Sequence, residues 1–321
     1  YLYHNSKFCQ KYKKHMGFKM IDQTKGIWKK TPYTSLLYLL LIVILACLIS
    51  SYLFGAVACK LIYGISFFSS SQQVFDPSNK QLIEAMKTMQ LFNALGTFVL
   101  PPFLFLHFRG SVALTYLKLD KSISKTSVFR VFIMALFMIP IANYLGALNE
   151  SIPLPEFLNF LKIAEEQTLL LTEQFLIMNS LSDLFLMIII MGVVAAVGEE
   201  LLFRGLLQRL FQDWSGNKHL AVWLTALLFS VIHMQYHAVL PRFFLGAFIG
   251  YVFVYSGSLR TSIYLHFFYN TSLVLLTYCI QHKMVPSSWE SIGTSNFSMF
   301  ILSLVLIFGF SYSWFTKNKA A

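Results

Sequence analysis

The feature that most constrains this chain is a series of long stretches without a single Asp, Glu, Lys or Arg. A helix needs about 20 apolar residues to cross the roughly 30 Å of hydrocarbon in a bilayer. Seven stretches approach or exceed that length: 31–59, 88–108, 131–149, 219–241, 243–259, 261–282 and 291–316. An eighth, between Asp183 and Glu199, holds only 15 uncharged residues, so it can cross only by carrying Glu199 and Glu200 into the bilayer.

Composition agrees with a membrane protein. Apolar residues make up 56% of the chain and charged residues 12%, whereas a soluble domain usually has about 25% charged residues. The net charge of +11 fits contact with membrane lipids better than binding of nucleic acid, because it occurs in so apolar a chain. We therefore predict an all-α, polytopic integral membrane protein with about eight transmembrane helices, and no nucleic-acid partner.

Charge also predicts the orientation and the division of the chain. Residues 1–30 carry eight lysines and are expected to be a basic cytosolic tail, because Lys and Arg concentrate on the cytosolic side. Residues 31–182 would contain the N-terminal spans and an acidic extracytoplasmic segment with Glu150, Glu156, Glu165, Glu166 and Glu173, and Asp183 directly follows it. Residues 183–321 would contain the C-terminal spans. With eight spans both termini are cytosolic, and we expect a prokaryotic plasma (inner) membrane.

Polar side chains inside the predicted spans are the candidate functional residues. They are Glu199, Glu200, His233, His266 and Asn270. An ionised group at the centre of a membrane helix costs on the order of 2.5 to 3.5 kcal/mol, so such residues are retained for a reason. One reason is structural, because polar side chains can hydrogen-bond neighbouring helices together. The other is chemistry.

The spacing of Glu199 and His233 favours chemistry. The turn around Trp214-Ser-Gly-Asn joins their two helices, with arms of similar length on either side, so the two residues should lie at about the same depth. A carboxylate facing an imidazole in an apolar cavity can act as a general-base pair that takes a proton from water.

Two further pairs are each four residues apart and so share a helix face. Glu200 and Arg204 should form an ion pair that neutralises the second carboxylate and fixes the rotation of the helix. His266 and Asn270 could donate two hydrogen bonds to the oxyanion of an acyl-transfer reaction.

These residues resemble the motifs of the CPBP family of intramembrane proteases, which includes the CAAX prenyl proteases and the Abi, bacteriocin-processing proteins. The three motifs are EExxxR, FxxxH and HxxxN/D, and they occur in this order as Glu199-Glu200-Leu-Leu-Phe-Arg204, Phe229-Ser-Val-Ile-His233 and His266-Phe-Phe-Tyr-Asn270. The resemblance covers residues 183–277.

The resemblance implies a membrane endopeptidase in which Glu199 and His233 activate water while His266 and Asn270 stabilise the oxyanion. Eukaryotic and archaeal members remove the last three residues of prenylated CaaX proteins at the cytosolic face. The implied partner is thus a membrane-bound protein or peptide substrate, with or without a lipid group. Other bacterial relatives resemble immunity or scaffold proteins, so a non-catalytic membrane protein of the same fold is one alternative.

A second alternative is a zinc-dependent form of the protease, because the family has been described both as zinc-dependent and as metal-free. His233-Met-Gln-Tyr-His237 has the HxxxH spacing of zinc peptidases. The ligands would be His233, His266 and Glu199, with His237 as a further candidate. The preferred expectation is no cofactor. A small-solute transporter is disfavoured because no internal repeat is found.

Overall fold

The computed structural model describes residues 31–68 and 79–317, so the predicted basic tail 1–30 lies outside the described residues. Every regular element within the described ranges is helical, and no strand occurs among them. This agrees with the predicted all-α class.

Within residues 31–68 and 79–317, six helices are long and apolar enough to cross a membrane. They are α2 (Tyr33–Tyr63); the run Lys80–Phe108, made of α3 (Lys80–Ala94), η3 (Leu95–Val99) and α4 (Leu100–Phe108); α6 (Lys125–Glu150); the run Leu181–Ser215, made of α8 (Leu181–Met187), η5 (Ile188–Val194), α9 (Ala195–Glu199), η6 (Glu200–Leu207) and α10 (Gln208–Ser215); η7 with α12 (Tyr236–Ala238 and Val239–Ser256); and α13 (Leu259–Gln281).

The other two predicted spans correspond to helices of a different length or start. The span expected at 219–241 is helix α11, Lys218–Val231, which is shorter than a full crossing. The span expected at 291–316 begins six residues later than predicted, at Phe297 of α14 (Phe297–Lys317). Within the described residues the structure is thus a polytopic helical bundle with six candidate spans, and the predicted number of eight is not confirmed.

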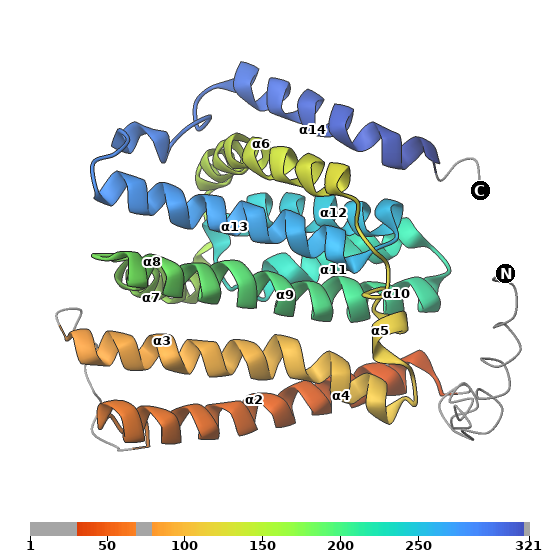
Figure 1. The fold of residues 1–321 in the computed structure, drawn as a ribbon, viewed down its shortest axis with the longest axis horizontal. Coiled ribbons are helices and arrows are strands. Elements are labelled where there is room, and N and C mark those ends of the chain that lie inside the picture. The colour runs from red at the N-terminus through yellow and green to blue at the C-terminus, as the bar shows by residue number, and fades with distance from the viewer. Residues whose placement is uncertain (1–30, 69–78, 318–321) are drawn as a thin grey trace, which may run out of the picture.

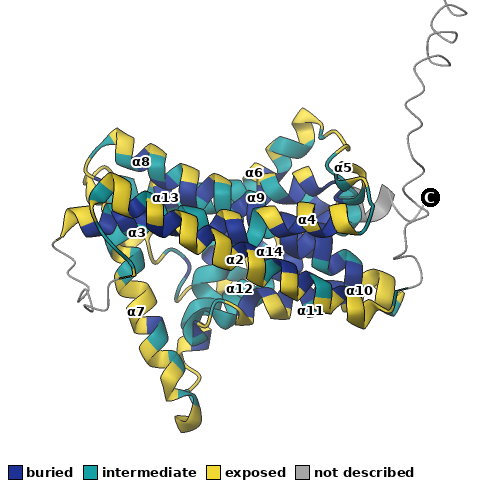
Figure 2. Ribbon diagram, turned by 90° about the horizontal axis from the view of Figure 1, so that it is seen from below, coloured by how far each residue is buried: buried dark blue, intermediate teal, exposed yellow. Residues whose placement is uncertain are grey.

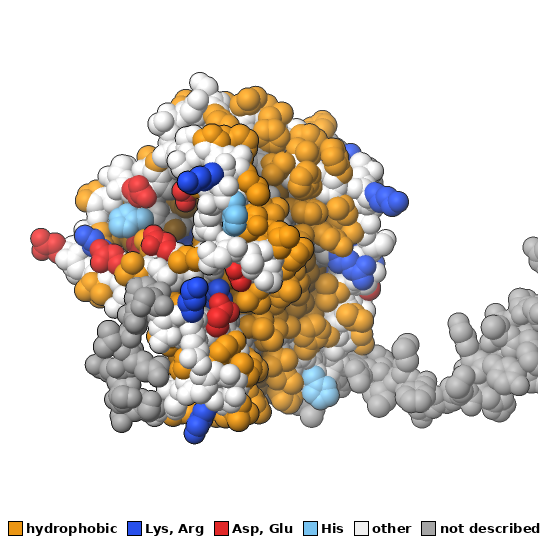
Figure 3. Space-filling model, turned by 60° about the vertical axis from the view of Figure 1, so that its left-hand side comes forward, with side chains coloured by type: hydrophobic (Ala, Val, Ile, Leu, Met, Phe, Trp, Pro, Cys, Tyr) orange, Lys and Arg blue, Asp and Glu red, His pale blue; other side chains and the backbone are white. Residues whose placement is uncertain are grey.

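The long helices lie side by side, and the start of α2 and the end of α14 are at the same end of the bundle (Figure 1). Figure 3 shows a broad belt of apolar side chains between two ends at which charged side chains gather. Such a belt is what a bilayer covers. The polytopic membrane assignment therefore rests on both the lengths and the surface of these helices.

The acidic segment forms the short 3-10 helix η4 (Glu156–Leu158) and helix α7 (Asn159–Phe175). Helix α7 runs across the direction of the long helices and projects from the bundle (Figure 2). Its exposed apolar side chains include Phe160, Ile163 and Leu169. A helix in this orientation with exposed apolar side chains can lie along a membrane surface.

Close helix contacts hold the run Leu181–Ser215 at the centre of the bundle. Gly198 lies directly against η3, where an added Cβ would come within 2.8 Å of the Cβ of Phe98. The residues that follow, from Glu200 to Leu206, are all buried. The helix segment with both carboxylates is therefore enclosed by its neighbours instead of facing lipid.

Candidate active site

The turn predicted between α10 and α11 forms at the expected residues. Gly216 ends α10 in the left-handed conformation with a φ of 66°, which favours glycine. The Asn217 side chain then caps α11 by accepting hydrogen bonds from the backbone of His219 and Leu220. Two antiparallel helices result, and Figure 1 shows this turn extending beyond the start of α13. The extension lets the middle of both helices reach residues near the start of α13.

Glu200 is the centre of a buried polar cluster. Its Oε1 accepts a hydrogen bond of 2.7 Å from Nη1 of Arg204 and one of 2.9 Å from Nδ1 of His266. Both side chains of the Glu200–Arg204 ion pair are fully buried. Nη2 of Arg204 donates to the backbone oxygen of Gly246 at 3.1 Å. The predicted ion pair is therefore present, and it also fixes the ring of His266.

Gly246 allows this arrangement because α11 and α12 pack closely at that residue. An added Cβ would lie 3.2 Å from both the Cα of Ala226 and Cδ1 of Phe229. The backbone oxygen of Gly246 thereby comes within reach of Arg204. The guanidinium of Arg204 also lies over the ring of Phe229, at 4.7 Å from its centroid, a cation–π contact in a buried setting.

Glu199 lies next to His266. Its Oε2 is 3.8 Å from Nε2 of His266, and its side chain keeps 13% exposure while that of Glu200 has none. The two carboxylates therefore differ in their environment. Glu200 is neutralised by Arg204, whereas Glu199 is in contact with an imidazole and retains some access for a small molecule.

His233 does not pair with Glu199 as the sequence had indicated; the ion-pair contact of Glu199 is with His266. Instead, Nδ1 of His233 lies 2.6 Å from the backbone oxygen of Phe229. A carbonyl oxygen can only accept, so Nδ1 carries the proton and Nε2 has a lone pair in the neutral ring. The Phe229 ring contacts the rings of His233 and His266 with centroids 5.1 Å and 6.2 Å away. Both histidines thus flank one aromatic ring.

Asn270 makes an interhelical hydrogen bond. Its Nδ2 donates to the backbone oxygen of Met191 at 2.9 Å. Met191 lies in the π-helical segment η5, and such widened turns are frequent at functional sites. A carboxamide nitrogen carries two N–H groups, so this bond fixes the side chain while it uses only one of them.

His237 does not follow His233 on one continuous helix, so the HxxxH spacing does not place the two histidines on one helix face. Helix α11 ends at Val231, and Met234 has a φ of 53° before the short helix η7. Nδ1 of His237 lies 2.9 Å from Oε2 of Glu165, whose side chain is almost completely buried. This long-range contact ties α7 to the segment that follows His233.

The proposed zinc ligands therefore do not fit a metal site together. Within residues 31–68 and 79–317, no group of three or more His, Cys, Asp or Glu side chains is arranged to hold a metal ion. His237 is bound to Glu165, and both ring nitrogens of His266 face carboxylates.

Arg242 is a site residue that sequence reasoning missed, since it was assigned to the loop between two spans. Helix α12 begins at Val239, so Arg242 lies in its first turns. Its guanidinium donates to the side chain of Gln235 and is close enough to Glu199 and His233 to act on both electrostatically. The earlier start of α12 thus brings a cation to the site.

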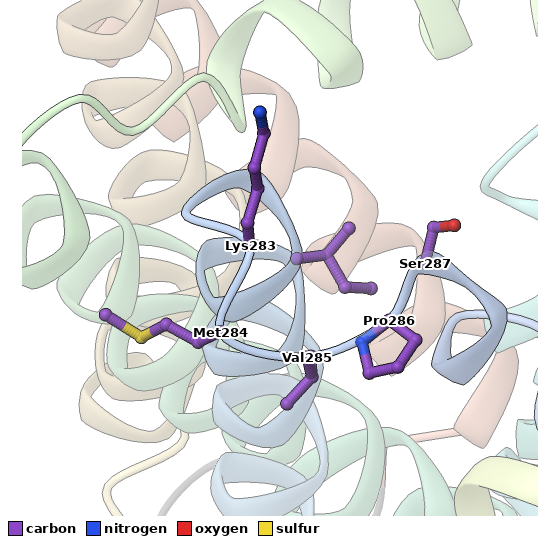
Figure 4. A pocket seen from close by; sticks show the side chains of 6 residues that line it. Lys283, Met284, Val285, Pro286 and Ser287 are labelled. Carbon is purple, nitrogen blue, oxygen red and sulfur yellow. The ribbon is translucent and has the colours of Figure 1, made fainter.

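A surface hollow of about 440 Å³ lies elsewhere. It is lined by a single stretch of chain after α13: Ile280, Lys283, Met284, Val285, Pro286 and Ser287 (Figure 4). None of the candidate site residues borders it. The hollow is therefore not part of the candidate active site.

Comparison with known proteins gives a family match over the part of the chain that contains the carboxylate and histidine cluster. No curated protein matches the chain. No solved structure matches it either. Residues 181–272 match the family described as type II CAAX prenyl endopeptidase Rce1-like. This range contains Glu199, Glu200, Arg204, His233, His266 and Asn270. This match confirms the resemblance to the CPBP family of intramembrane proteases over that part of the chain.

Proposed function

We propose that the protein is an intramembrane endopeptidase of the CAAX type that hydrolyses a peptide bond of a membrane-associated protein. The observation that carries the proposal is the position of Glu199, which contacts His266 inside a bundle of apolar helices while the adjacent Glu200 is neutralised by Arg204. Of the two carboxylates, only Glu199 is without a permanent cationic partner at ion-pair distance. It is therefore the one that can take up a proton during a reaction.

Glu199 acts as the general base. Water donates a hydrogen bond to its carboxylate, gives up a proton to it and attacks the carbonyl carbon of the scissile bond. The C–N bond then breaks, and the proton moves from Glu199 to the leaving amine. Nε2 of His233 orients the water, because Nδ1 of this ring is held by the backbone oxygen of Phe229.

His266 and Asn270 stabilise the tetrahedral oxyanion. The Nδ1–H of His266 donates to Glu200, and Nε2 lies on the side of Glu199, where the reacting carbonyl would lie. Nε2 donates to the oxyanion when the ring is an imidazolium with a proton on both nitrogens. Asn270 is held by Met191 and has a second N–H for the oxyanion. Preorganised donors of this kind lower the barrier because they need no rearrangement as charge develops.

The substrate that this site favours is a protein or peptide already held at the membrane, with prenylated CaaX proteins as the first class to test. The family match supports this substrate class. We further propose that both termini are cytosolic and that the site opens to the cytosol. Residues 183–277 form the protease core. Residues 31–182 supply the supporting spans and the acidic extracytoplasmic segment.

A comparison of membrane peptidomes tests the function and needs no identified substrate. Cells would express either the parent protein or Glu199→Gln, at matched levels in the membrane. Peptides released only by the parent would identify the substrate and the cleaved bond. Identical peptidomes would contradict a protease and favour a non-catalytic scaffold of the same fold.

A further inference from the structure

A cluster of cations surrounds Tyr116 at one end of the bundle. Nη1 of Arg109, just after α4, donates to the Tyr116 hydroxyl at 3.0 Å, and its guanidinium lies 5.1 Å from the ring centroid. The guanidinium of Arg209 in α10 lies 4.2 Å from the same centroid. Tyr116 ends the short helix α5 (Ala113–Tyr116), which Figure 1 places at the end of the bundle where α10 ends. Two arginines thus contact one aromatic ring.

The positive charge of this cluster is not balanced. Neither Arg109 nor Arg209 forms an ion pair with a carboxylate of the described ranges. Asp213 is the carboxylate close enough to act on Tyr116, and it is exposed. Burial, together with the nearby charges of Arg209 and Lys121, lowers the pKa of Lys118. These cations therefore repel one another, and an anion between them would relieve the repulsion.

One donor of the cluster is also unused. Nη1 of Arg209 is buried and has no hydrogen-bond partner. A buried N–H of a charged group that lacks a partner is destabilising, because its desolvation is not compensated. A guanidinium with free N–H groups is well shaped to bind phosphate oxygens through two parallel hydrogen bonds. The geometry therefore suits an oxyanion.

The surroundings of the cluster are apolar and exposed. Phe108, Val112 and Leu114 flank Arg109 and Tyr116 in the chain, and all three side chains are exposed. Phe108 ends a membrane-spanning run. A free phosphate would gain nothing from these side chains, whereas the acyl chains of a lipid would cover them.

We propose that Arg109, Tyr116 and Arg209, with Lys118 and Lys121 beside them, bind the phosphate group of an anionic phospholipid at the membrane surface. The lipid headgroup bridges the two guanidinium groups, and its acyl chains lie along Phe108 and Leu114. The lipid holds α4, α5 and α10 together at this end of the bundle. The proposal does not depend on the proteolytic function.

Native mass spectrometry of the purified full-length protein tests the site. The protein in detergent is titrated with phosphatidylglycerol or phosphatidylcholine of the same acyl chains. The parent should retain phosphatidylglycerol more strongly. Each cation near an anionic headgroup contributes about fivefold in affinity, so Arg109→Gln and Arg209→Gln should each weaken phosphatidylglycerol binding by about that factor. Lys121→Gln, at an exposed position where packing is not disturbed, should weaken it in the same direction.

Lys283→Gln is the matched control for Lys121→Gln, because Lys283 is an exposed lysine that follows the last residue of α13, whereas the first residue of α13 lies against Lys118. It should bind both lipids as the parent does. Equal retention of phosphatidylglycerol by the parent, the cluster variants and this control would overturn the proposal. Displacement of the lipid by an equal concentration of inorganic phosphate would overturn the assignment of the ligand as a lipid.

Discussion

The replacement Glu200→Gln offers a strong test of the buried cluster, because it removes one charge and almost nothing else. Glu200 accepts hydrogen bonds from Arg204 and His266, and neither Glu200 nor Arg204 has any exposed side-chain surface. Removal of one member of a buried ion pair costs about 3 to 5 kcal/mol, because the other charge is left without compensation. We expect the lower value, about 3 kcal/mol, since the amide oxygen can still accept and Arg204 keeps its bond to Gly246.

The assay is thermal unfolding of the purified protein in detergent. On the scale of soluble domains, where 1 kcal/mol shifts Tm by roughly 2 to 4 °C, the expected fall is about 6 to 12 °C. Glu199→Gln is the matched control, because it changes the adjacent residue in the same way but leaves the ion pair intact. Its Tm should remain close to that of the parent.

A second variant separates the effect of the uncompensated Arg204 charge from other effects of the Glu200→Gln substitution. Addition of Arg204→Met to Glu200→Gln removes the uncompensated cation and should restore at least half of the lost stability. A Glu200→Gln protein as stable as the parent would refute this reasoning. So would a double variant that is less stable than Glu200→Gln alone.

Three other outcomes are expected. Asn270→Ala should lower kcat by about 10² to 10³ with little change in KM. A lower Tm at an unchanged kcat would show that Asn270 serves only to bond Met191. His237→Ala should leave both activity and metal content unchanged, since His237 binds Glu165. Stoichiometric zinc in the parent that is lost together with activity in His237→Ala would contradict this. Cysteines at the exposed positions 121 and 166 should be labelled by an impermeant reagent in intact cells only at 166, and labelling at 121 alone would reverse the proposed orientation.

The sequence predicted those contacts that depend on spacing along one helix. The Glu200–Arg204 pair follows directly from a separation of four residues, and it is present. The turn at Gly216 and Asn217 follows from residue types that favour turns, and it is also present. Local chemistry is sufficient in both cases, because no partner from another part of the chain is needed.

Contacts between helices were less predictable. Equal depth in the membrane indicated Glu199 and His233 as partners, but depth does not define which neighbouring helix a side chain faces, and Glu199 contacts His266. The end of α11 at Val231 has no glycine or proline to signal it, so the HxxxH pattern appeared helical when it is not. The contact between Glu165 and His237 joins residues 72 positions apart, and nothing in the pattern of either segment indicates it.

The central claim is that Glu199 is the general base of a membrane peptidase. The most direct measurement is the rate at which purified protein in liposomes cleaves a farnesylated CaaX peptide, followed by mass spectrometry of the products. The parent should release the C-terminal peptide, and Glu199→Gln should be slower by at least about 10²-fold at an unchanged Tm. A Glu199→Gln protein that cleaves at more than about a tenth of the parent rate would contradict the account.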